Sequence, residues 1–172
     1  MIVYLIGFMG SGKSTTGKKL ASALNWNLID LDMEIERRTG QLVHDIFVEH
    51  GEGHFRKVES DVLRSLLFDE DIIISCGGGT PCFNSNMEFM LNNGLTVYLK
   101  MDAEQLRSRL VNSHTVRPLL KNLNKDELLV FIQNSLAERE SCYDKSEVVI
   151  QGLDVDIVSL KNKILKQNNP QV

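Results

Sequence analysis

The segment GFMGSGKST, residues 7–15, constrains the fold of this chain more than any other stretch. It fits the pattern G-x-x-x-x-G-K-[ST], and it stands between an apolar run, IVYLI at 2–6, and a segment whose apolar residues have helical spacing. In that context the glycines let backbone N–H groups turn toward one point, and the start of the following helix adds positive potential. The segment therefore predicts a phosphate-binding loop between a strand and a helix.

Two side chains of this loop have expected roles toward a nucleotide. Lys13 can reach the β- and γ-phosphates, and the hydroxyl of Ser14 can ligate Mg²⁺. We therefore expect the loop to bind a nucleoside triphosphate together with Mg²⁺. The residues expected to contact the nucleotide are Gly10, Ser11, Gly12, Lys13, Ser14 and Thr15.

The rest of the chain alternates short apolar runs with segments of helical spacing. The apolar runs are continuous, which is typical of strands covered on both faces, and they lie at 2–6, 27–29, 71–75, 95–99 and 147–150. This alternation predicts an α/β fold with a five-stranded parallel sheet between helices, the three-layer sandwich of P-loop NTPases and nucleoside-monophosphate kinases. Such sheets bind ligands at the carboxyl ends of their strands, so we expect the site in loops 7–14, 30–34, 76–82 and 101–103.

Composition narrows the class of protein. The chain has 172 residues, 42% of them hydrophobic, which fits one domain with its own core. A formal net charge of -4 gives no indication of a nucleic-acid or anionic-membrane partner. The first apolar run is too short for a signal segment or a membrane span. The three cysteines, Cys76, Cys82 and Cys142, form no paired framework, and we interpret them as buried or incidental thiols of a cytoplasmic protein.

Three further segments offer candidate site residues. Asp30 and Asp32 follow the second expected strand, although Asp32 could instead cap the next helix, a common use of aspartate. Arg56 lies beside Phe55 near the start of an amphipathic helix and, taken alone, also fits a solvated surface residue. Three glycines at 77–79 follow the third strand, which indicates a backbone that another group approaches closely.

Taken in order, these segments resemble the shikimate kinase family from about residue 2 to residue 150. The matching pieces are GFMGSGKST, DLDMEIE, IFVEHGEGHFRKVE, CGGG, RPLL at 117–120 and RESCY at 139–143. The resemblance implies transfer of the γ-phosphoryl group of ATP to the 3-hydroxyl of shikimate, a step of chorismate and aromatic amino-acid biosynthesis. It also implies a single kinase domain over 1–172, with an acceptor-binding region near 31–60 and a lid near 111–123.

The same resemblance implies roles on the substrate side. Arg56 and Arg139 match two arginines that bind the substrate carboxylate, where planar guanidinium groups give oriented, charge-assisted binding. Asp32 matches the acid that accepts hydrogen bonds from the hydroxyl groups, and it is the candidate base for the attacking one. The glycines Gly77, Gly78 and Gly79 match the backbone that contacts substrate and the transferring phosphoryl group.

On the nucleotide side, Asp30 matches an acid that acts on Mg²⁺ through water, beside the Ser14 ligand. Arg117 matches a lid arginine that closes over the phosphates. The expected catalytic set is then Lys13, Asp32 and Arg117. For the adenine contact the sequence leaves Arg107 and Arg109 as alternatives.

Two other functions compete with this interpretation. A kinase for another small hydroxylated acid, such as gluconate, would also use a carboxylate clamp. A nucleotide-binding module without transfer chemistry would keep only the phosphate loop, whereas Lys13, Ser14, Asp32 and Arg117 are all present here. We expect a monomer that binds ATP and shikimate.

Overall fold

The structure is a computed structural model that describes residues 1–113, 120, 123–152 and 154–168. Five strands form one parallel sheet in the order β2-β3-β1-β4-β5. They are β1 (Ile2–Ile6), β2 (Asn27–Asp30), β3 (Ile72–Ser75), β4 (Leu95–Lys100) and β5 (Val148–Gln151). The expected α/β fold is confirmed, and each strand boundary lies within one residue of its predicted position.

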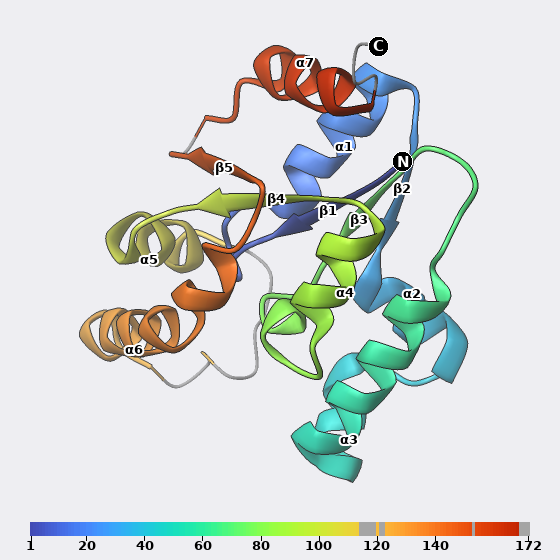
Figure 1. Ribbon diagram of the computed structural model, residues 1–172. Coiled ribbons are helices and arrows are strands. Elements are labelled where there is room, and N and C mark those ends of the chain that lie inside the picture. The colour runs from blue at the N-terminus through green and yellow to red at the C-terminus, as the bar shows by residue number, and fades with distance from the viewer. Residues whose placement is uncertain (114–119, 121–122, 153, 169–172) are drawn as a thin grey trace.

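Helices cover both faces of the sheet (Figure 1). One face carries α1 (Lys13–Leu24) and α7 (Ile157–Asn168); the other carries α2 (Leu31–Thr39), α3 (Val43–Ser65), α4 (Asn86–Asn93) and the end of α6 (Lys125–Tyr143). α5 (Ala103–Val111) packs with α6 around Phe8, and the short helix η1 (Thr80–Cys82) follows β3. This arrangement is a three-layer sandwich.

The central strand explains why its apolar run is continuous. Side chains of a strand alternate between the two faces of a sheet. In β1, Ile2, Tyr4 and Ile6 pack in the core under α2, α3 and α4, whereas Val3 and Leu5 pack in the core under α1 and α7. All five are almost completely buried, so each position of this strand requires an apolar or aromatic residue.

The junction of β2 and α2 corrects two expectations. The N-cap of α2 is Asp30, whose side chain accepts a hydrogen bond from the backbone N–H of Asp32 at 3.2 Å. Capping by Asp32 is therefore wrong, and residues 31–34 are helix where a loop was expected. The physical reason is that the strand passes directly into the helix, so the first acid already occupies the capping position.

α3 is interrupted where it approaches the site. Gly51 has φ 81° and ψ 169°, values outside the helical region, and it divides the helix into two parts. The second part carries Arg56 and Glu59 on one side, since positions three apart share a helical face. Phe55 and Val62 of this part are buried in the core, which holds the helix against the sheet.

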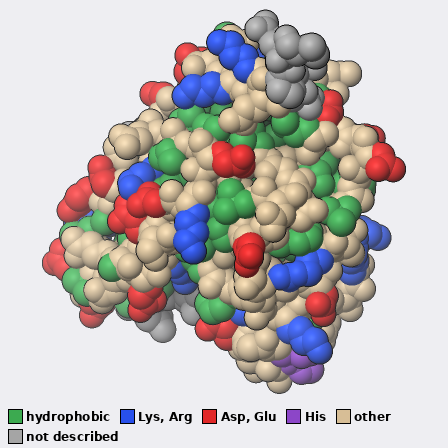
Figure 2. All heavy atoms as spheres, in the orientation of Figure 1, with side chains coloured by type: hydrophobic (Ala, Val, Ile, Leu, Met, Phe, Trp, Pro, Cys, Tyr) green, Lys and Arg blue, Asp and Glu red, His purple; other side chains and the backbone are tan. Residues whose placement is uncertain are grey.

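The charged side chains on the visible surface do not indicate a particular partner. Figure 2 shows Lys, Arg, Asp and Glu side chains intermixed on the visible face, without a large area of one sign. Within the described part of the chain, no helix combines the length and apolar character needed to span a membrane.

Candidate active site

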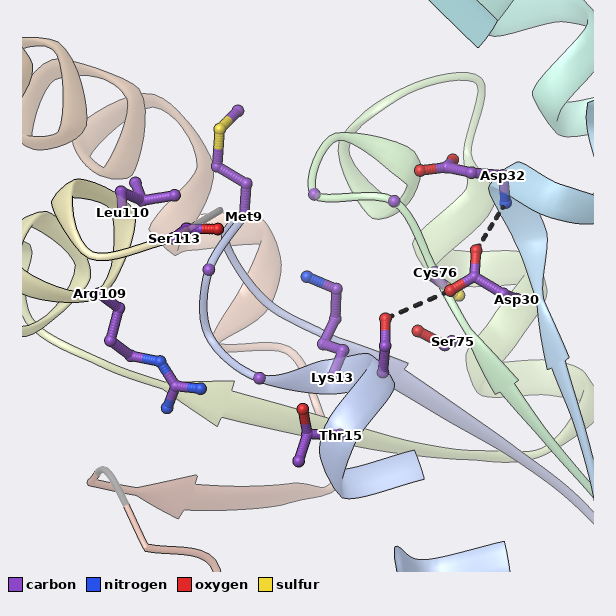
Figure 3. A pocket seen from close by; sticks show the side chains of 15 residues that line it. Met9, Lys13, Thr15, Asp30, Asp32, Ser75, Cys76, Arg109, Leu110 and Ser113 are labelled. Carbon is purple, nitrogen blue, oxygen red and sulfur yellow. Dashed lines mark hydrogen bonds between the residues drawn. The ribbon is translucent and has the colours of Figure 1, made fainter. Parts of the chain in front are cut away.

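A cavity of about 440 Å³ opens where the carboxyl ends of β1 and β3 meet the start of α1 and the end of α5 (Figure 3). Its lining residues are Met9, Gly10, Gly12, Lys13, Ser14, Thr15, Asp30, Asp32, Ser75, Cys76, Gly77, Gly78, Arg109, Leu110 and Ser113. In Figure 3, Lys13 lies between the two aspartates on one side and Arg109 on the other. The cavity therefore brings a cation and two carboxylates to one edge of the parallel sheet, where ligands of such folds bind.

The loop before α1 forms the floor of this cavity. Gly12 has φ 93°, and a Cβ atom there would lie 3.1 Å from Nη2 of Arg109, so the backbone conformation and the close contact both favour glycine. The ammonium group of Lys13 donates hydrogen bonds to the carbonyl oxygens of Gly7 at 2.8 Å and Phe8 at 2.9 Å. The side chain of Lys13 is thereby held along the loop, with its charge at the cavity.

Ser11 is the one predicted nucleotide contact of this loop that does not line the cavity. Its backbone N–H donates to the carbonyl oxygen of Phe8 at 3.1 Å, and its side chain is 4% exposed. The residue supports the turn from within, whereas Gly10, Gly12, Lys13, Ser14 and Thr15 all reach the cavity.

Ser14 and Asp30 form an oxygen-rich pair at the mouth of the loop. The Ser14 hydroxyl donates to Oδ2 of Asp30 at 3.3 Å, while Oδ1 of Asp30 accepts from the backbone of Asp32. A hydroxyl and a carboxylate in contact are hard oxygen ligands, the type that Mg²⁺ prefers. The donor set therefore fits Mg²⁺, either directly or through its bound waters.

Asp32 points from the first turn of α2 toward the triple-glycine loop. Burial raises the pKa of its carboxyl to about 6; the negative charges of Asp30 and Glu59 act in the same direction, and Lys13 opposes them. Oδ1 of Asp32 lies 3.2 Å from the position that a Cβ atom would take at Gly77, so the loop passes directly beside the carboxylate. An acid with a pKa near neutrality can exchange a proton with a bound hydroxyl group.

Arg56 is held by two glutamates next to this loop. Its Nη1 donates to Oε2 of the buried Glu59 at 2.8 Å, and its Nε and Nη2 donate to Oε1 of Glu52 at 3.2 and 3.0 Å. Glu59 also accepts a hydrogen bond from Thr80 at 2.6 Å. The Arg56 side chain is only 11% exposed, so the interpretation as a solvated surface residue is wrong.

Gly79 lies against the same guanidinium group. A Cβ atom there would lie 2.8 Å from Cζ and Nη1 of Arg56, and this contact explains why the third glycine is needed. Phe83 contributes the other wall, since Cζ of Arg56 lies 4.2 Å from its ring centroid. Contacts with the Glu59 carboxylate, the Phe83 ring and the Gly79 backbone thus hold the Arg56 side chain in one position.

Arg139 and Tyr143 approach the glycine loop from α6. They are four positions apart on one helical face, and Arg139 is close enough that its positive charge acts to lower the pKa of the Tyr143 hydroxyl, although burial raises that pKa overall. The guanidinium of Arg139 lies 5.7 Å from the ring centroid of Phe8. The hydroxyl of Tyr143 donates to the carbonyl oxygen of Gly78. The buried ring of Tyr143 packs beside Tyr98 of β4, with centroids 5.0 Å apart, so this contact is anchored in the core.

The structure separates the predicted residues into groups. Lys13, Ser14, Asp30, Asp32, Gly77 and Gly78 line one cavity; Gly79 and Arg56 lie together beside it, and Arg139 lies on α6 near the same loop. Arg117 lies outside the described residues, as does most of the predicted lid. Between the two adenine candidates, Arg109 lines the cavity, whereas Arg107 forms an ion pair with Glu104 at 2.7 Å.

Sequence reasoning missed several residues around this site. Glu59 received no role, although an acid three positions after Arg56 on a helix is a recognisable signal for an ion pair. Ser75 and Tyr143 also touch the site, through the cavity wall and Gly78 respectively. For Ser75 the only signal was its place at the end of a buried strand.

Comparisons with known proteins agree with the geometry. The sequence model of the family described as "Shikimate kinase" matches residues 9–167. A shikimate kinase from Parabacteroides distasonis is 42% identical over 168 residues, covering 95% of this chain and 97% of the relative. The crystal structure of shikimate kinase from Bacteroides thetaiotaomicron superposes with a TM-score of 0.89 at 36% identity, covering 99% of both chains.

Two other solved structures differ in how similar they are to this chain. Shikimate kinase from Acinetobacter baumannii, solved in complex with shikimate, has a TM-score of 0.81 at 33% identity and covers 98% of this chain and 93% of its own. A gluconokinase from Sinorhizobium meliloti has a TM-score of 0.60 at 16% identity, covering 95% of this chain and 88% of its own. At that identity, the second likeness concerns the fold alone.

Proposed function

The chain belongs to the shikimate kinase family, and on that premise we propose that it transfers the γ-phosphoryl group of ATP to the 3-hydroxyl of shikimate. The observation that carries the proposal is the position of Asp32 and Gly77 beside the phosphate loop, next to the buried Arg56–Glu59 pair. That arrangement offers an acceptor for hydroxyl groups and a cation for a carboxylate on one side of a phosphate site. Shikimate carries both kinds of group.

For the carboxylate, we assign Arg56 and Arg139. The Nε–Nη2 edge of Arg56 is occupied by Glu52, whose side chain is 56% exposed, while Nη1 is held by the buried Glu59. A substrate carboxylate would replace the exposed acid on that edge and leave the buried one in place. Arg139 would supply the second guanidinium group, next to Tyr143.

For the transfer, we assign Asp32 as the group that orients the 3-hydroxyl and accepts its proton. Its pKa of about 6 keeps it ionised at neutral pH, yet basic enough to take a proton as the oxygen bonds to phosphorus. Lys13 would stabilise charge on the transferring phosphoryl group. The same carboxylate would hold the attacking oxygen in line with the phosphate, which contributes to the rate through orientation.

The backbone around Gly78 would complete the contacts to substrate and phosphoryl group. A Cβ atom at Gly78 would lie 3.2 Å from the backbone nitrogen of Met9, so this loop and the phosphate loop are already in contact. We also assign Gly77 and Gly79 as substrate contacts, and Arg117 as a catalytic residue that acts on the phosphates.

For the metal and the nucleotide base, we assign Ser14 and Asp30 to Mg²⁺ and Arg109 to adenine. When bound, Mg²⁺ neutralises charge on the β- and γ-phosphates. Asp30 would act through water, since its two oxygens already interact with Ser14 and the Asp32 backbone. Arg109 would stack on the base from the end of α5, where its guanidinium faces Gly12.

We further propose that the protein acts as a cytoplasmic monomer. All three thiols are free, which suits a reducing compartment. Sedimentation velocity at several protein concentrations tests the oligomeric state directly.

A coupled ADP-release assay with shikimate, gluconate and AMP as separate acceptors tests the reaction. We expect shikimate alone to stimulate ADP release. The Lys13→Met variant serves as the control for contaminating kinases, because it lacks the cation at the phosphate loop. Stimulation by gluconate or AMP without any by shikimate would overturn the assignment, and absence of all stimulation would favour a binding module.

A further inference from the structure

Cys82 and Cys142 meet in the fold although they are far apart in the sequence. Cys82 ends η1, and Cys142 lies in the last turn of α6. Both side chains are half-buried and both pack against the core beneath α3 and α4, where η1 contacts α6. The two thiols are close enough that each is the largest influence on the pKa of the other. The fold therefore brings two of the three thiols together, although their positions in the sequence did not indicate it.

The surroundings of the pair distinguish the two sulfur atoms. The interaction with Cys82 lowers the pKa of the Cys142 thiol, with Lys145 acting in the same direction, whereas the same interaction raises the pKa of Cys82. Arg139 and Arg56 lie close enough to Cys82 to stabilise negative charge there. Because its pKa is lowered, Cys142 is the better nucleophile toward an oxidant. The two arginines stabilise the thiolate of Cys82 when Cys82 reacts in its turn with the oxidised Cys142.

The third cysteine provides an internal comparison. Cys76 is 2% exposed at the end of β3, where burial raises its pKa, and its thiol contacts the carbonyl oxygen of Ile74 and the sulfur of Met90. A buried thiol with a raised pKa stays in the neutral form, which reacts slowly with oxidants. Reactivity is therefore expected at the pair and not at Cys76.

We propose that Cys82 and Cys142 are a peroxide-sensitive dithiol that closes to a reversible disulfide and weakens shikimate binding. In the first step, the Cys142 thiolate attacks one oxygen of hydrogen peroxide, the O–O bond breaks, and hydroxide leaves and is protonated to water. In the second step, the Cys82 thiolate attacks the sulfur of the Cys142 sulfenic acid, the S–O bond breaks, and a second water forms. Two thiols lose two electrons and two protons, and one peroxide is reduced to two waters.

The position of the pair links its oxidation to the substrate side of the site. η1 directly follows the glycine loop, and Arg139 lies one helical turn before Cys142. A disulfide requires sulfur atoms about 2.05 Å apart, closer than two thiols in non-covalent contact, so its closure draws the end of α6 toward η1. Arg139 and the Tyr143 contact to Gly78 then lose the freedom to adjust to a carboxylate, whereas neither cysteine of the pair lies on the phosphate loop or among the residues that line the cavity.

The covalent part of the proposal is tested without any activity measurement. The full chain is treated with hydrogen peroxide, alkylated in denaturant, and examined by intact mass and peptide mapping. We expect two of the three thiols to be lost, a mass decrease of two hydrogen atoms, a cross-link between the Cys82 and Cys142 peptides, and full reversal by dithiothreitol. Intermolecular cross-links, or oxidation without this cross-link, would refute the proposal.

Single variants identify the order of events. In Cys82→Ser, the reaction should stop at a sulfenic acid on Cys142, which dimedone traps. In Cys142→Ser, Cys82 should give little such adduct, and Cys76→Ser should still form the disulfide. Dimedone labelling of Cys82 in preference to Cys142 would contradict the assigned nucleophile.

The regulatory part rests on the proposed function and is tested separately. Oxidised protein should show a shikimate KM higher by about fivefold or more, the lower end of measured couplings between sites. The KM for ATP should be unchanged, dithiothreitol should reverse the effect, and Cys82→Ser should not show it. A disulfide that leaves the shikimate KM unchanged would refute regulation, whereas reduced protein that fails to phosphorylate shikimate would refute the proposed function and leave the dithiol chemistry standing.

Discussion

Glu59 is completely buried, and its Oε2 accepts a hydrogen bond from Nη1 of Arg56 at 2.8 Å. The same carboxylate accepts from Thr80 at 2.6 Å, so it connects α3 to η1 behind the glycine loop. A buried carboxylate is tolerated only when it is paired and hydrogen-bonded. The Arg56 side chain is therefore oriented by a charge that solvent cannot reach.

Replacing Glu59 should show whether the buried ion pair of Arg56 matters more for shikimate binding than its exposed ion pair does. Glu59→Ala leaves Arg56 without its buried partner, and we expect the shikimate KM to rise about tenfold or more and the free energy of unfolding to fall by about 3 kcal/mol. Glu52→Ala removes the exposed partner of the same arginine and should change both quantities little. Steady-state kinetics and urea denaturation measure the two effects, and equal effects of both variants would contradict the distinction.

Arg56→Lys tests whether planar, bidentate binding is needed. Lysine keeps the positive charge but binds a carboxylate as a point charge, so we expect the shikimate KM to rise about tenfold or more while the KM for ATP stays the same. The exposed Arg37→Lys on α2 is a matched control, since Arg37 forms an ion pair with Glu34 on the surface of that helix. An unchanged shikimate KM in Arg56→Lys would remove Arg56 from the substrate site.

Asp32 should impose a pH dependence on the reaction. Because its pKa in the folded protein is about 6, the ionised base is lost as pH falls through 6, and kcat/KM should fall with it. Asp32→Asn should reduce kcat about a hundredfold or more and abolish that acid limb. A pH profile of the wild type that stays flat down to pH 5 would argue against Asp32 as the base.

The raised pKa of Asp32 also predicts how the stability of the protein depends on pH, and stability should change with pH in the direction opposite to activity. The carboxyl of Asp32 holds its proton more tightly in the folded chain than its ordinary value of 3.8 allows, so its contribution to stability is present below pH 4 and is lost as pH rises through 6. Asp32→Asn cannot ionise, and its Tm should exceed that of the wild type at pH 7 but not at pH 4. A lower Tm than wild type at pH 7 would show that the ionised carboxylate is stabilising.

The two neighbouring arginines of α5 provide a matched pair for the nucleotide. Arg109→Ala removes a side chain that lines the cavity, and we expect the KM for ATP to rise about tenfold, as expected for loss of a stacked cation on an aromatic base. Among the described residues, Arg107 forms an ion pair with Glu104 and does not line the cavity, so Arg107→Ala should leave nucleotide binding unaffected. Comparable losses in both variants would point to a general effect on the helix.

Tyr143→Phe removes one hydroxyl group from the contact to Gly78. We expect kcat to fall with a smaller change in stability, because the buried ring remains in place while the loop carbonyl loses its donor. Tyr98→Phe, which alters the ring packed against Tyr143, is the control for core effects. If Tyr143→Phe loses stability without loss of kcat, the hydroxyl group has only a structural role.

Much of the architecture was accessible from local patterns. Continuous apolar runs located all five strands to within one residue, and the glycine-rich motif located the start of α1, because both depend on residues close together in the chain. The choice between Asp30 and Asp32 as the cap was not accessible. It depended on whether any residue separates β2 from α2, and two aspartates two positions apart look alike in the sequence.

The sequence by itself determined the phosphate loop, the parallel α/β sheet and the family resemblance, since each follows from the order and spacing of residue types. Tertiary structure decided which charges are buried and which distant side chains meet. It placed Glu59 behind Arg56, put Arg109 rather than Arg107 in the lining of the cavity, and brought Cys82 to Cys142. The physical reason is that burial, a shifted pKa and a thiol contact depend on how helices pack across a sheet, and that packing brings together residues whose separation in the chain carries no local signal.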